Sequence, residues 1–358
     1  MKASYKNFLM IKKKKIGNLD LFVTEIGMGT APLGGWPIAV DEKKALETLE
    51  TAWNNGIRYF DTAPLYGSGM AELRVGNFLK DKKREDFVLS SKVGRIIIDT
   101  NKSKAAEKFI GSPNDKDFKF DFSYDGVMKS FEDSLNRLQL NKIDILNLHD
   151  PDNHPDHFEQ ARSGAVKAMI KLKNEGLVTA LGCGLNQNEM LVELAKEGCF
   201  DCFLLAGRYT LLDQTSLDAL MPICESNNIS LILGGVFNSG ILINPSPESY
   251  FDYAKLDSNW FDSLTKSLVR KPKDHESAEF WLNKANNIKN VCENFDATLK
   301  KAAIQFPYFN NIVSSCILGM NSSNQVIENI EDYNRKLPSN FWQHLKDKKL
   351  IDWRSKIN

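Results

Sequence analysis

Short apolar runs alternate with amphipathic segments along most of the chain. Eight runs rich in β-branched and aliphatic residues end in polar or glycine-containing turns, at residues 23–31, 57–63, 86–93, 143–150, 178–185, 202–207, 230–235 and 315–320. Segments of helical period lie at 41–54, 70–80, 124–138, 157–175, 187–196, 213–227, 284–305 and 322–335. The runs are apolar on both faces, as parallel strands covered by helices are. Eight strand-helix units therefore predict an α/β fold of the (β/α)8 TIM barrel type rather than a doubly wound sheet.

Three segments fall outside this repeat. Residues 10–23 read as an N-terminal hairpin with Gly17 and Asn18 at its turn, placed to close the bottom of the barrel. The connections after strands 3 and 7, residues 96–122 and 241–283, are unusually long. Loops that follow barrel strands lie on the active face, so both are candidate lids or pocket walls. The second carries aromatic residues that suit a sugar or a planar ligand, and a small helical insertion with its own core is the alternative: Tyr250, Phe251, Tyr253, Trp260 and Phe261.

Composition narrows the classes of partner. Lysine plus arginine and aspartate plus glutamate number 46 each, so no net charge attracts nucleic acid or an anionic membrane surface. No run approaches the ~20 apolar residues of a membrane span, and the start lacks a signal-peptide pattern, so we expect a cytoplasmic protein. The six cysteines, including the Cys199 and Cys202 pair, are expected to be structural. With no linker in the sequence, we predict one domain over residues 1–358 and a small-molecule substrate.

Polar residues gather at the ends of three consecutive predicted strands. Asp61 and Tyr66 follow strand 2, Lys92 ends strand 3, and His149 with Asp150 ends strand 4. In a barrel these side chains converge on one mouth. A tyrosine hydroxyl titrates near ~10 in water, and a neighbouring ammonium favours its phenolate. The set therefore predicts a proton relay in which Asp61 holds Lys92, Lys92 lowers the pKa of Tyr66, and His149 orients a substrate oxygen.

The segment "HDPDNHPDH" brings three histidines together, which raises the question of a metal. His149, His154 and His157 are separated by Pro151 and Pro155, which interrupt a regular helix, and no cysteine cluster accompanies them. We expect no metal site.

Three motifs, "FDTAPLYGSGMAELRVGNFL", "LSSKVGR" and "LNLHDPD", occur in the order and at the intervals found in the aldo-keto reductase superfamily. The chain resembles that family over residues 21 to 329. The resemblance implies a (β/α)8 barrel and hydride transfer between a substrate carbon and C4 of a nicotinamide. It also implies a catalytic tetrad of Asp61, Tyr66, Lys92 and His149, with Tyr66 as general acid in reduction or general base in oxidation.

The same resemblance assigns the cofactor contacts. Asn186 matches the residue that holds the carboxamide, Tyr209 the aromatic that stacks on the nicotinamide, 234–242 the pyrophosphate loop and 318–329 the adenosine segment. The implied set is Thr30, Asp61, Asn186, Tyr209, Gly235, Val236, Phe237, Gly240, Gly319, Asn321, Gln325 and Asn329. Many NADP-using relatives carry a basic residue at the position of Asn321, and an amide cannot match a guanidinium as a phosphate partner. NAD is therefore the expected cofactor, with NADP as the alternative.

"GMGTAPLGG" and "LLAGRYTLLDQ" look most like the branch that holds aldose 1-dehydrogenases and pyridoxal 4-dehydrogenase. This resemblance implies oxidation of C1 of an aldopyranose, of the L-fucose or D-arabinose type, to its lactone. Trp36, Asp150 and Asp152 are the expected sugar contacts. The alternatives are a pyridoxal 4-dehydrogenase, an NADPH-dependent carbonyl reductase, and a regulatory subunit that keeps the barrel and cofactor, as potassium-channel β subunits resemble reductases.

Overall fold

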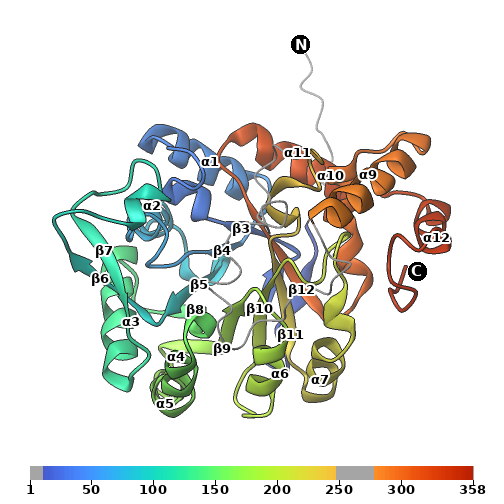
Figure 1. Cartoon of the computed structure of the whole chain (residues 1–358). Helices are drawn as coiled ribbons and strands as arrows, with labels where there is room; N and C mark the ends of the chain where they lie inside the picture. The colour runs from blue at the N-terminus through green and yellow to red at the C-terminus, as the bar shows by residue number, and fades with distance from the viewer. Residues whose placement is uncertain (1–10, 247–277, 358) are drawn as a thin grey trace.

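Eight parallel strands close into a barrel surrounded by helices (Figure 1). The structure is a computed structural model that describes residues 11–246 and 278–357. The barrel strands are β3 (Ile26–Gly29), β4 (Tyr59–Asp61), β5 (Val88–Val93), β8 (Ile143–His149), β9 (Val178–Leu185), β10 (Cys202–Ala206), β11 (Ser230–Gly234) and β12 (Val313–Gly319). They pair in this chain order, and β12 pairs with β3 to complete the ring. The predicted (β/α)8 barrel is confirmed.

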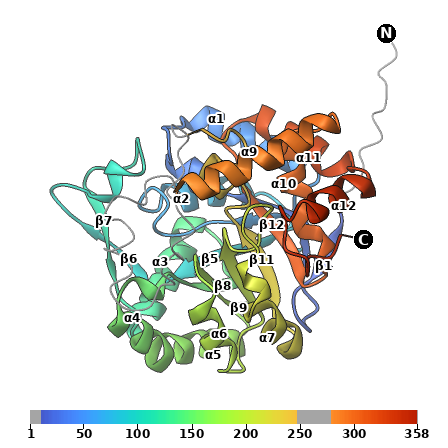
Figure 2. The same ribbon diagram turned by 45° about the vertical axis from the view of Figure 1, so that its right-hand side comes forward.

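The helices pack on the outside of the ring, as a second view also shows (Figure 2). They are α1 (Glu42–Asn54), α2 (Met70–Leu79), α3 (Tyr124–Leu138), α4 (Pro155–Gln160), α5 (Val166–Asn174), α6 (Glu189–Ala195), α7 (Leu220–Asn227), α9 (Ala278–Asn294), α10 (Leu299–Gln305), α11 (Ser323–Asn334) and α12 (Ser339–Asp347). Polar side chains fix several starting points. Asp41 accepts a hydrogen bond of 2.8 Å from the backbone N–H of Lys44, and Ser123 one of 3.0 Å from Gly126. None of the helices in these ranges is long and apolar enough to cross a bilayer.

Three predicted helices need correction, and one helix was missed. The predicted helix 213–227 is a short 3-10 turn at Thr215–Leu217 followed by α7, which starts at Leu220. The predicted helix 157–175 begins two residues earlier and contains a π-helical turn at Ala161–Ala165 between α4 and α5. The predicted helix 284–305 is two helices, because Asp296 takes a left-handed conformation (φ 50°) and Thr298 caps a new start. The pattern also missed α12, which packs Phe341 and Trp342 into the core.

The predicted N-terminal hairpin is present and covers the N-terminal ends of the barrel strands. Strand β1 (Lys13–Lys15) pairs antiparallel with β2 (Phe22–Thr24). Ile16 and Val23 are fully buried and join Tyr59 and Ile145 in the apolar cluster that fills this end of the barrel interior. The backbone N–H of Gly17 donates to Ser230 Oγ at 2.8 Å, which ties the turn to the start of β11. This end of the barrel is therefore closed by packed side chains.

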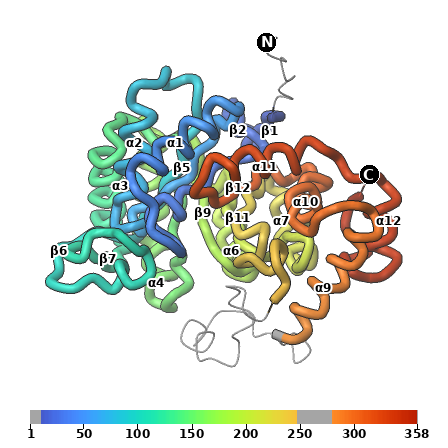
Figure 3. Tube along the Cα trace, turned by 90° about the horizontal axis from the view of Figure 1, so that it is seen from above, coloured from blue at the N-terminus to red at the C-terminus, as the bar shows by residue number. Residues whose placement is uncertain are grey.

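The first long connection is an ordered hairpin of β6 (Arg95–Asp99) and β7 (Lys116–Phe120), which extends to one side of the barrel (Figure 3). Its tip returns toward the mouth, where the backbone N–H of Ile110 donates to Gly35 O at 2.9 Å. Any side chain at Gly35 (φ 99°) would place its Cβ 2.2 Å from Ile110 O, so this contact requires glycine. The five aromatic residues predicted as pocket walls in the second connection lie outside the described residues.

Candidate active site

A cavity of about 630 Å³ opens at the C-terminal ends of the barrel strands. It is lined by most of the predicted site residues: Thr30, Trp36, Asp61, Tyr66, Lys92, His149, Asp150, Asn186, Gly235, Val236, Phe237, Gly240, Gly319, Asn321 and Gln325. These residues come from segments spread over nearly three hundred positions, and barrel closure brings them together. The predicted convergence at the mouth is therefore what the structure shows.

Lys92 and Asp61 form a buried ion pair at the base of the cavity. Lys92 Nζ donates to Asp61 Oδ2 at 2.7 Å and to the Thr62 carbonyl at 2.8 Å, and the two side chains are 1% and 4% exposed. Ser90 Oγ donates to the other carboxylate oxygen of Asp61 at 2.7 Å. Burial acts against the ammonium, but Asp61 and Tyr66 outweigh it and raise the pKa of Lys92. The cavity thus contains a fixed positive charge.

Tyr66 lies between this charge and the histidine. Lys92 Nζ is 4.8 Å from the centre of the Tyr66 ring, and the His149 ring meets it edge-on with centroids 5.9 Å apart. Burial raises the pKa of Tyr66 above its ordinary value of 10.0 and outweighs the lowering effect of Lys92. The sequence predicted a lowered pKa for Tyr66, and that prediction is wrong for the net shift. Lys92 does lower the pKa, but desolvation of the phenolate is the larger effect. The phenol is protonated at neutral pH.

His149 ends β8 and is 6% exposed. Burial, and then the positive charges of Arg95 and Lys92, lower the pKa of its imidazole well below 6.5. Its Nδ1 has no hydrogen-bond partner among the described residues, and Nε2 lies 3.5 Å from Asp150 Oδ2. A neutral imidazole carries one N–H, so His149 can donate a hydrogen bond to a substrate oxygen without adding a charge.

Arg95 was missed by the sequence analysis and supports this part of the site. Its Nη2 donates to Asp150 Oδ2 at 2.9 Å, and its Nη1 donates to the His149 carbonyl at 3.2 Å. It is the first residue of β6, three positions after Lys92 in "LSSKVGR". That proximity was the available signal, but the hairpin geometry that turns Arg95 toward β8 is not visible in the sequence.

Asp152 is not among the residues that line the cavity. It accepts a hydrogen bond of 2.9 Å from Gln187 Nε2, and burial together with the negative charge of Asp150 raises its pKa to about 6. The structure therefore does not bring Asp152 to the cavity wall, and its sugar contact stays a prediction. Phe109 and Lys108, from the first long connection, and Ile243, from the second, are lining residues that the motifs did not reveal.

Two predicted cofactor contacts also lie away from the cavity lining. Tyr209 is fully buried, and its ring packs against Phe306 with centroids 5.5 Å apart. Asn329 is 3% exposed, within α11. The structure therefore does not bring Tyr209 to the cavity for the predicted stacking, because the residue lies past the end of β10 and its ring belongs to the core. At the end of the next strand, β11, Gly234 and Gly235 do line the cavity.

The remaining predicted cofactor contacts form a cradle that suits a dinucleotide. Gly235 and Gly240 adopt left-handed conformations (φ 59° and 104°), and nothing lies within 4 Å of the point where a Cβ of Gly240 would stand. Turns of this kind present backbone N–H groups to phosphate oxygens. At the other end of the cradle, the Asn321 N–H donates to Gln325 Oε1 at 2.9 Å. The cations among the lining residues are Lys92 and Lys108, and neither belongs to this segment.

The histidines of "HDPDNHPDH" have separate structural positions. His154 caps α4, where its Nδ1 accepts from the Asp156 N–H at 3.2 Å, and His157 packs 5.0 Å from the Phe120 ring. Pro155 starts α4 instead of preventing a helix, which suits a residue without a backbone N–H. Across residues 11–246 and 278–357, no group of three histidine, cysteine or acidic side chains is placed to hold a metal ion.

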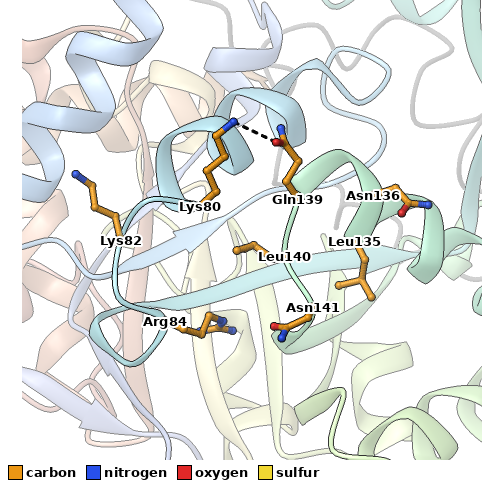
Figure 4. Close-up of a pocket in the computed structure, with 8 residues that line it drawn as sticks. All are labelled: Lys80, Lys82, Arg84, Leu135, Asn136, Gln139, Leu140 and Asn141. Atoms are coloured by element: carbon orange, nitrogen blue, oxygen red, sulfur yellow. Dashed lines mark hydrogen bonds between the residues drawn. The ribbon is translucent and has the colours of Figure 1, made fainter.

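A second hollow lies at the N-terminal ends of β5 and β8, at the far end of the barrel (Figure 4). It is lined by Lys80, Lys82, Arg84, Leu135, Asn136, Gln139, Leu140 and Asn141. Lys80 Nζ donates to Gln139 Oε1 at 3.1 Å, and Arg84 pairs with Asp144 at 2.6 Å. These pairs hold α2, α3 and β8 together, and the hollow has no acid-base pair suited to the chemistry of the cavity.

Comparison with known proteins agrees with the barrel fold. A sequence model described as the Aldo/keto reductase family matches residues 25–349. A pyridoxal 4-dehydrogenase from Microbacterium luteolum is 35% identical, over 95% of this chain and 98% of that protein. A D-threo-aldose 1-dehydrogenase from a Pseudomonas species is 34% identical, over 92% and 95%. An aldo-keto reductase from Bacillus halodurans, in its holo form, superimposes with a TM-score of 0.70 at 22% identity, over 96% of this chain and 97% of that one, which shows a shared fold.

Proposed function

Because the chain belongs to the aldo/keto reductase family and is an oxidoreductase, we propose that it oxidises C1 of an aldopyranose to the lactone with NAD. The arrangement of Tyr66, Lys92 and His149 around one cavity, with Asp150 beside them, carries the proposal. Two relatives at 34% and 35% identity are named as dehydrogenases, of D-threo-aldoses and of pyridoxal. A sugar of the L-fucose or D-arabinose type is the substrate we favour.

In this mechanism Tyr66 is the general base. Its phenol first releases its proton to solvent, and the nearby Lys92 ammonium stabilises the resulting phenolate, which then accepts the proton of the anomeric hydroxyl. Asp61 keeps Lys92 charged and fixed through the 2.7 Å contact. His149, neutral through burial, donates to the same substrate oxygen and orients it. A nicotinamide held by the lining residues Asn186, Gly235 and Val236 would supply the acceptor for the hydride that leaves C1.

The rest of the cavity wall fits a small ring. Trp36 and Phe109 provide apolar surface, and Asp150, whose side chain is 28% exposed, provides a carboxylate that accepts hydrogen bonds from hydroxyls. Leu65 adds to the apolar side. A pyranose has both an apolar face and a polar edge, and the wall offers a counterpart to each.

Pyridoxal is the second candidate substrate. The lining near the catalytic residues is rich in apolar and aromatic groups, which a planar ring also suits, and the 35% identical relative carries that name. Reduction of a carbonyl with NADPH uses the same residues with Tyr66 as the acid. A purely regulatory role is less well supported, because the buried Lys92 and Asp61 pair is costly to maintain unless it serves chemistry.

Aldo-keto reductases use nicotinamide cofactors, usually NADPH, yet we propose NAD here. In residues 319–325 the cavity is lined by a glycine and two amides, Asn321 and Gln325, and no basic side chain of that segment lies in the lining. A 2′-phosphate placed there gains no charge-assisted hydrogen bond from them.

The deciding experiment mixes the purified protein with NAD or NADP and a panel of aldoses, pyridoxal and simple aldehydes, and follows the reduced nicotinamide by absorbance in both directions. We expect oxidation of a pyranose with NAD to give the highest kcat/KM. Cofactor binding without turnover of any panel member would reject the enzymatic proposal in favour of the regulatory one. Preference for pyridoxal would reject only the sugar.

A further inference from the structure

Arg95 connects the β6-β7 hairpin to the catalytic histidine. It is 6% exposed, and its guanidinium carbon lies 4.8 Å from the centre of the Phe120 ring and 5.4 Å from that of Phe118. Its carbonyl accepts a hydrogen bond of 3.0 Å from Ser130 Oγ on α3. Two aromatic rings of the β6-β7 hairpin, the insertion after β5, therefore pack against the side chain, and α3 holds the backbone of the same residue.

The guanidinium donates hydrogen bonds to two adjacent residues of the site. Nη2 holds the Asp150 carboxylate at 2.9 Å and Nη1 holds the His149 carbonyl at 3.2 Å. Asp150 itself has a left-handed backbone conformation (φ 46°), which aspartate adopts more readily than most non-glycine residues. A planar fork with several donors in fixed directions is suited to grip both acceptors at once.

We propose that Arg95 is a positioning residue: it fixes Asp150 beside His149 and balances the Asp150 charge, so that His149 keeps a neutral imidazole directed at the substrate. The proposal rests on the proposed function for its substrate, a cyclic hemiacetal with a hydroxyl next to the oxidised carbon. Asp150 then accepts a hydrogen bond from that neighbouring hydroxyl, while His149 donates one to the oxygen on the oxidised carbon.

The reason is electrostatic. Asp150 Oδ2 lies 3.5 Å from His149 Nε2, and an unbalanced carboxylate at that distance favours an imidazolium. An imidazolium would form an ion pair with Asp150, and its Nε2–H would point at the carboxylate instead of the substrate.

Besides Arg95 and Asp150, Lys92 on β5 acts on His149 through its charge and the Tyr66 ring after β4 packs against it, while Lys108 lines the same cavity. Lys92 acts in the same direction as Arg95, and both lower the pKa of His149 after burial. Arg95 is the cation of this group that contacts Asp150 directly.

The test follows His149 by nuclear magnetic resonance in Arg95→Met. The chain has five histidines, and the signal lost in His149→Gln identifies the relevant one. We expect the His149 titration midpoint to rise by about one pH unit or more in Arg95→Met, the scale of one nearby uncompensated charge. The double variant Arg95→Met with Asp150→Asn removes that charge and is expected to return the midpoint to the wild-type range.

Activity gives a second readout. Arg95→Lys keeps the charge, but a single ammonium does not bridge both acceptors. We expect it to leave His149 neutral, lower kcat/KM roughly tenfold and leave the Kd for NAD within about twofold. Arg84→Met is the matched control, since it breaks the Arg84 and Asp144 pair at the far end of the barrel, and it should change stability without moving the His149 midpoint.

An unchanged midpoint in Arg95→Met, or a shift that Asp150→Asn does not reverse, would overturn the inference. If Arg95→Met does not fold, Arg95→Lys decides: wild-type kcat/KM in that variant overturns the positioning role. The titration needs no substrate. A failed substrate panel with the expected titration therefore rejects the proposed function alone, whereas an active enzyme with an unmoved midpoint rejects only the role of Arg95.

Discussion

The two ends of the barrel interior are built from the same strands but have opposite character. At the N-terminal end, Tyr59 and Ile145 are fully buried in an apolar cluster that the hairpin residue Ile16 closes. Two residues after Tyr59 on β4 stands Asp61, and four after Ile145 on β8 stands His149. Even spacing along a strand keeps side chains on one face. The inward face of these strands therefore stabilises the fold at the N-terminal end of the barrel and carries the proposed chemistry at the C-terminal end.

The change from the apolar to the polar part of the barrel interior occurs at Asn147 on β8. It is fully buried, neither atom of its amide has a hydrogen-bond partner among the described residues, and it pairs in register with Lys92. On the N-terminal side of Asn147, burial of apolar side chains stabilises the fold. Toward the C-terminal ends of the strands, the Lys92 and Asp61 charges are held in a site with little access to water, and this burial of charge lowers the stability of the fold. Substitutions at the two ends should thus separate activity from stability.

The largest effect is expected at the polar end. Tyr66→Phe removes the proposed base, so kcat/KM should fall by roughly 10²- to 10⁴-fold, the usual contribution of a positioned acid or base. Cofactor affinity, measured by fluorescence titration, should stay within about twofold. Tyr308→Phe is the control, because it loses a buried hydroxyl that donates to the Glu25 carbonyl at 2.7 Å and should keep its activity. Loss of cofactor binding in Tyr66→Phe would contradict the assigned role.

At the apolar end the expected effect is on stability. Ile145→Ala leaves a cavity in a fully buried cluster, so the free energy of unfolding in urea should fall by about 2–5 kcal/mol. Well below the melting temperature, kcat/KM should be close to that of the wild type. Ile170→Ala, on the exposed side of α5, should change stability by only about 0.5 kcal/mol. A fall in kcat/KM as large as that of Tyr66→Phe would show that the two ends are not separable.

The pH dependence tests the balance of forces on Tyr66. Burial raises the pKa of its phenol above 10.0, so the phenolate fraction is small at neutral pH and grows as pH rises. Oxidation, which needs the phenolate, should accelerate about tenfold per pH unit between roughly pH 6 and 9, while reduction, which needs the phenol, should stay flat. A plateau in the oxidation rate near neutral pH would mean that Lys92 outweighs burial in the working enzyme.

The smallest effect concerns the rim of the cofactor cradle. Asn321→Arg introduces a guanidinium where we expect the adenosine ribose, so NADP should bind about tenfold more tightly and NAD with little change. Asn324→Arg adds the same charge on an exposed position of α11 that does not line the cavity. Equal gains from both variants would indicate a general effect of positive charge and would remove Asn321 from the cofactor site.

Much of the fold followed from local pattern, and the errors have local causes. Apolar runs and helical periods predicted the eight barrel strands and the terminal hairpin. The pattern merged α9 and α10, because a left-handed residue such as Asp296 leaves no mark in hydrophobic periodicity. The family resemblance assigned Tyr209 to the nicotinamide, since a motif fixes chain position but not the direction of a side chain beyond the end of a strand.

By itself, the sequence determined which residues stand at the ends of the barrel strands, and so which acids and bases share a mouth. Alternation and strand order are properties of neighbouring residues, and they put Asp61, Lys92 and His149 there. Only the tertiary structure decided that Arg95 reaches Asp150 from a separate hairpin and that burial raises the pKa of Tyr66. Contact and desolvation depend on everything packed around a group, most of which is distant in the chain, so neither is written in the local sequence.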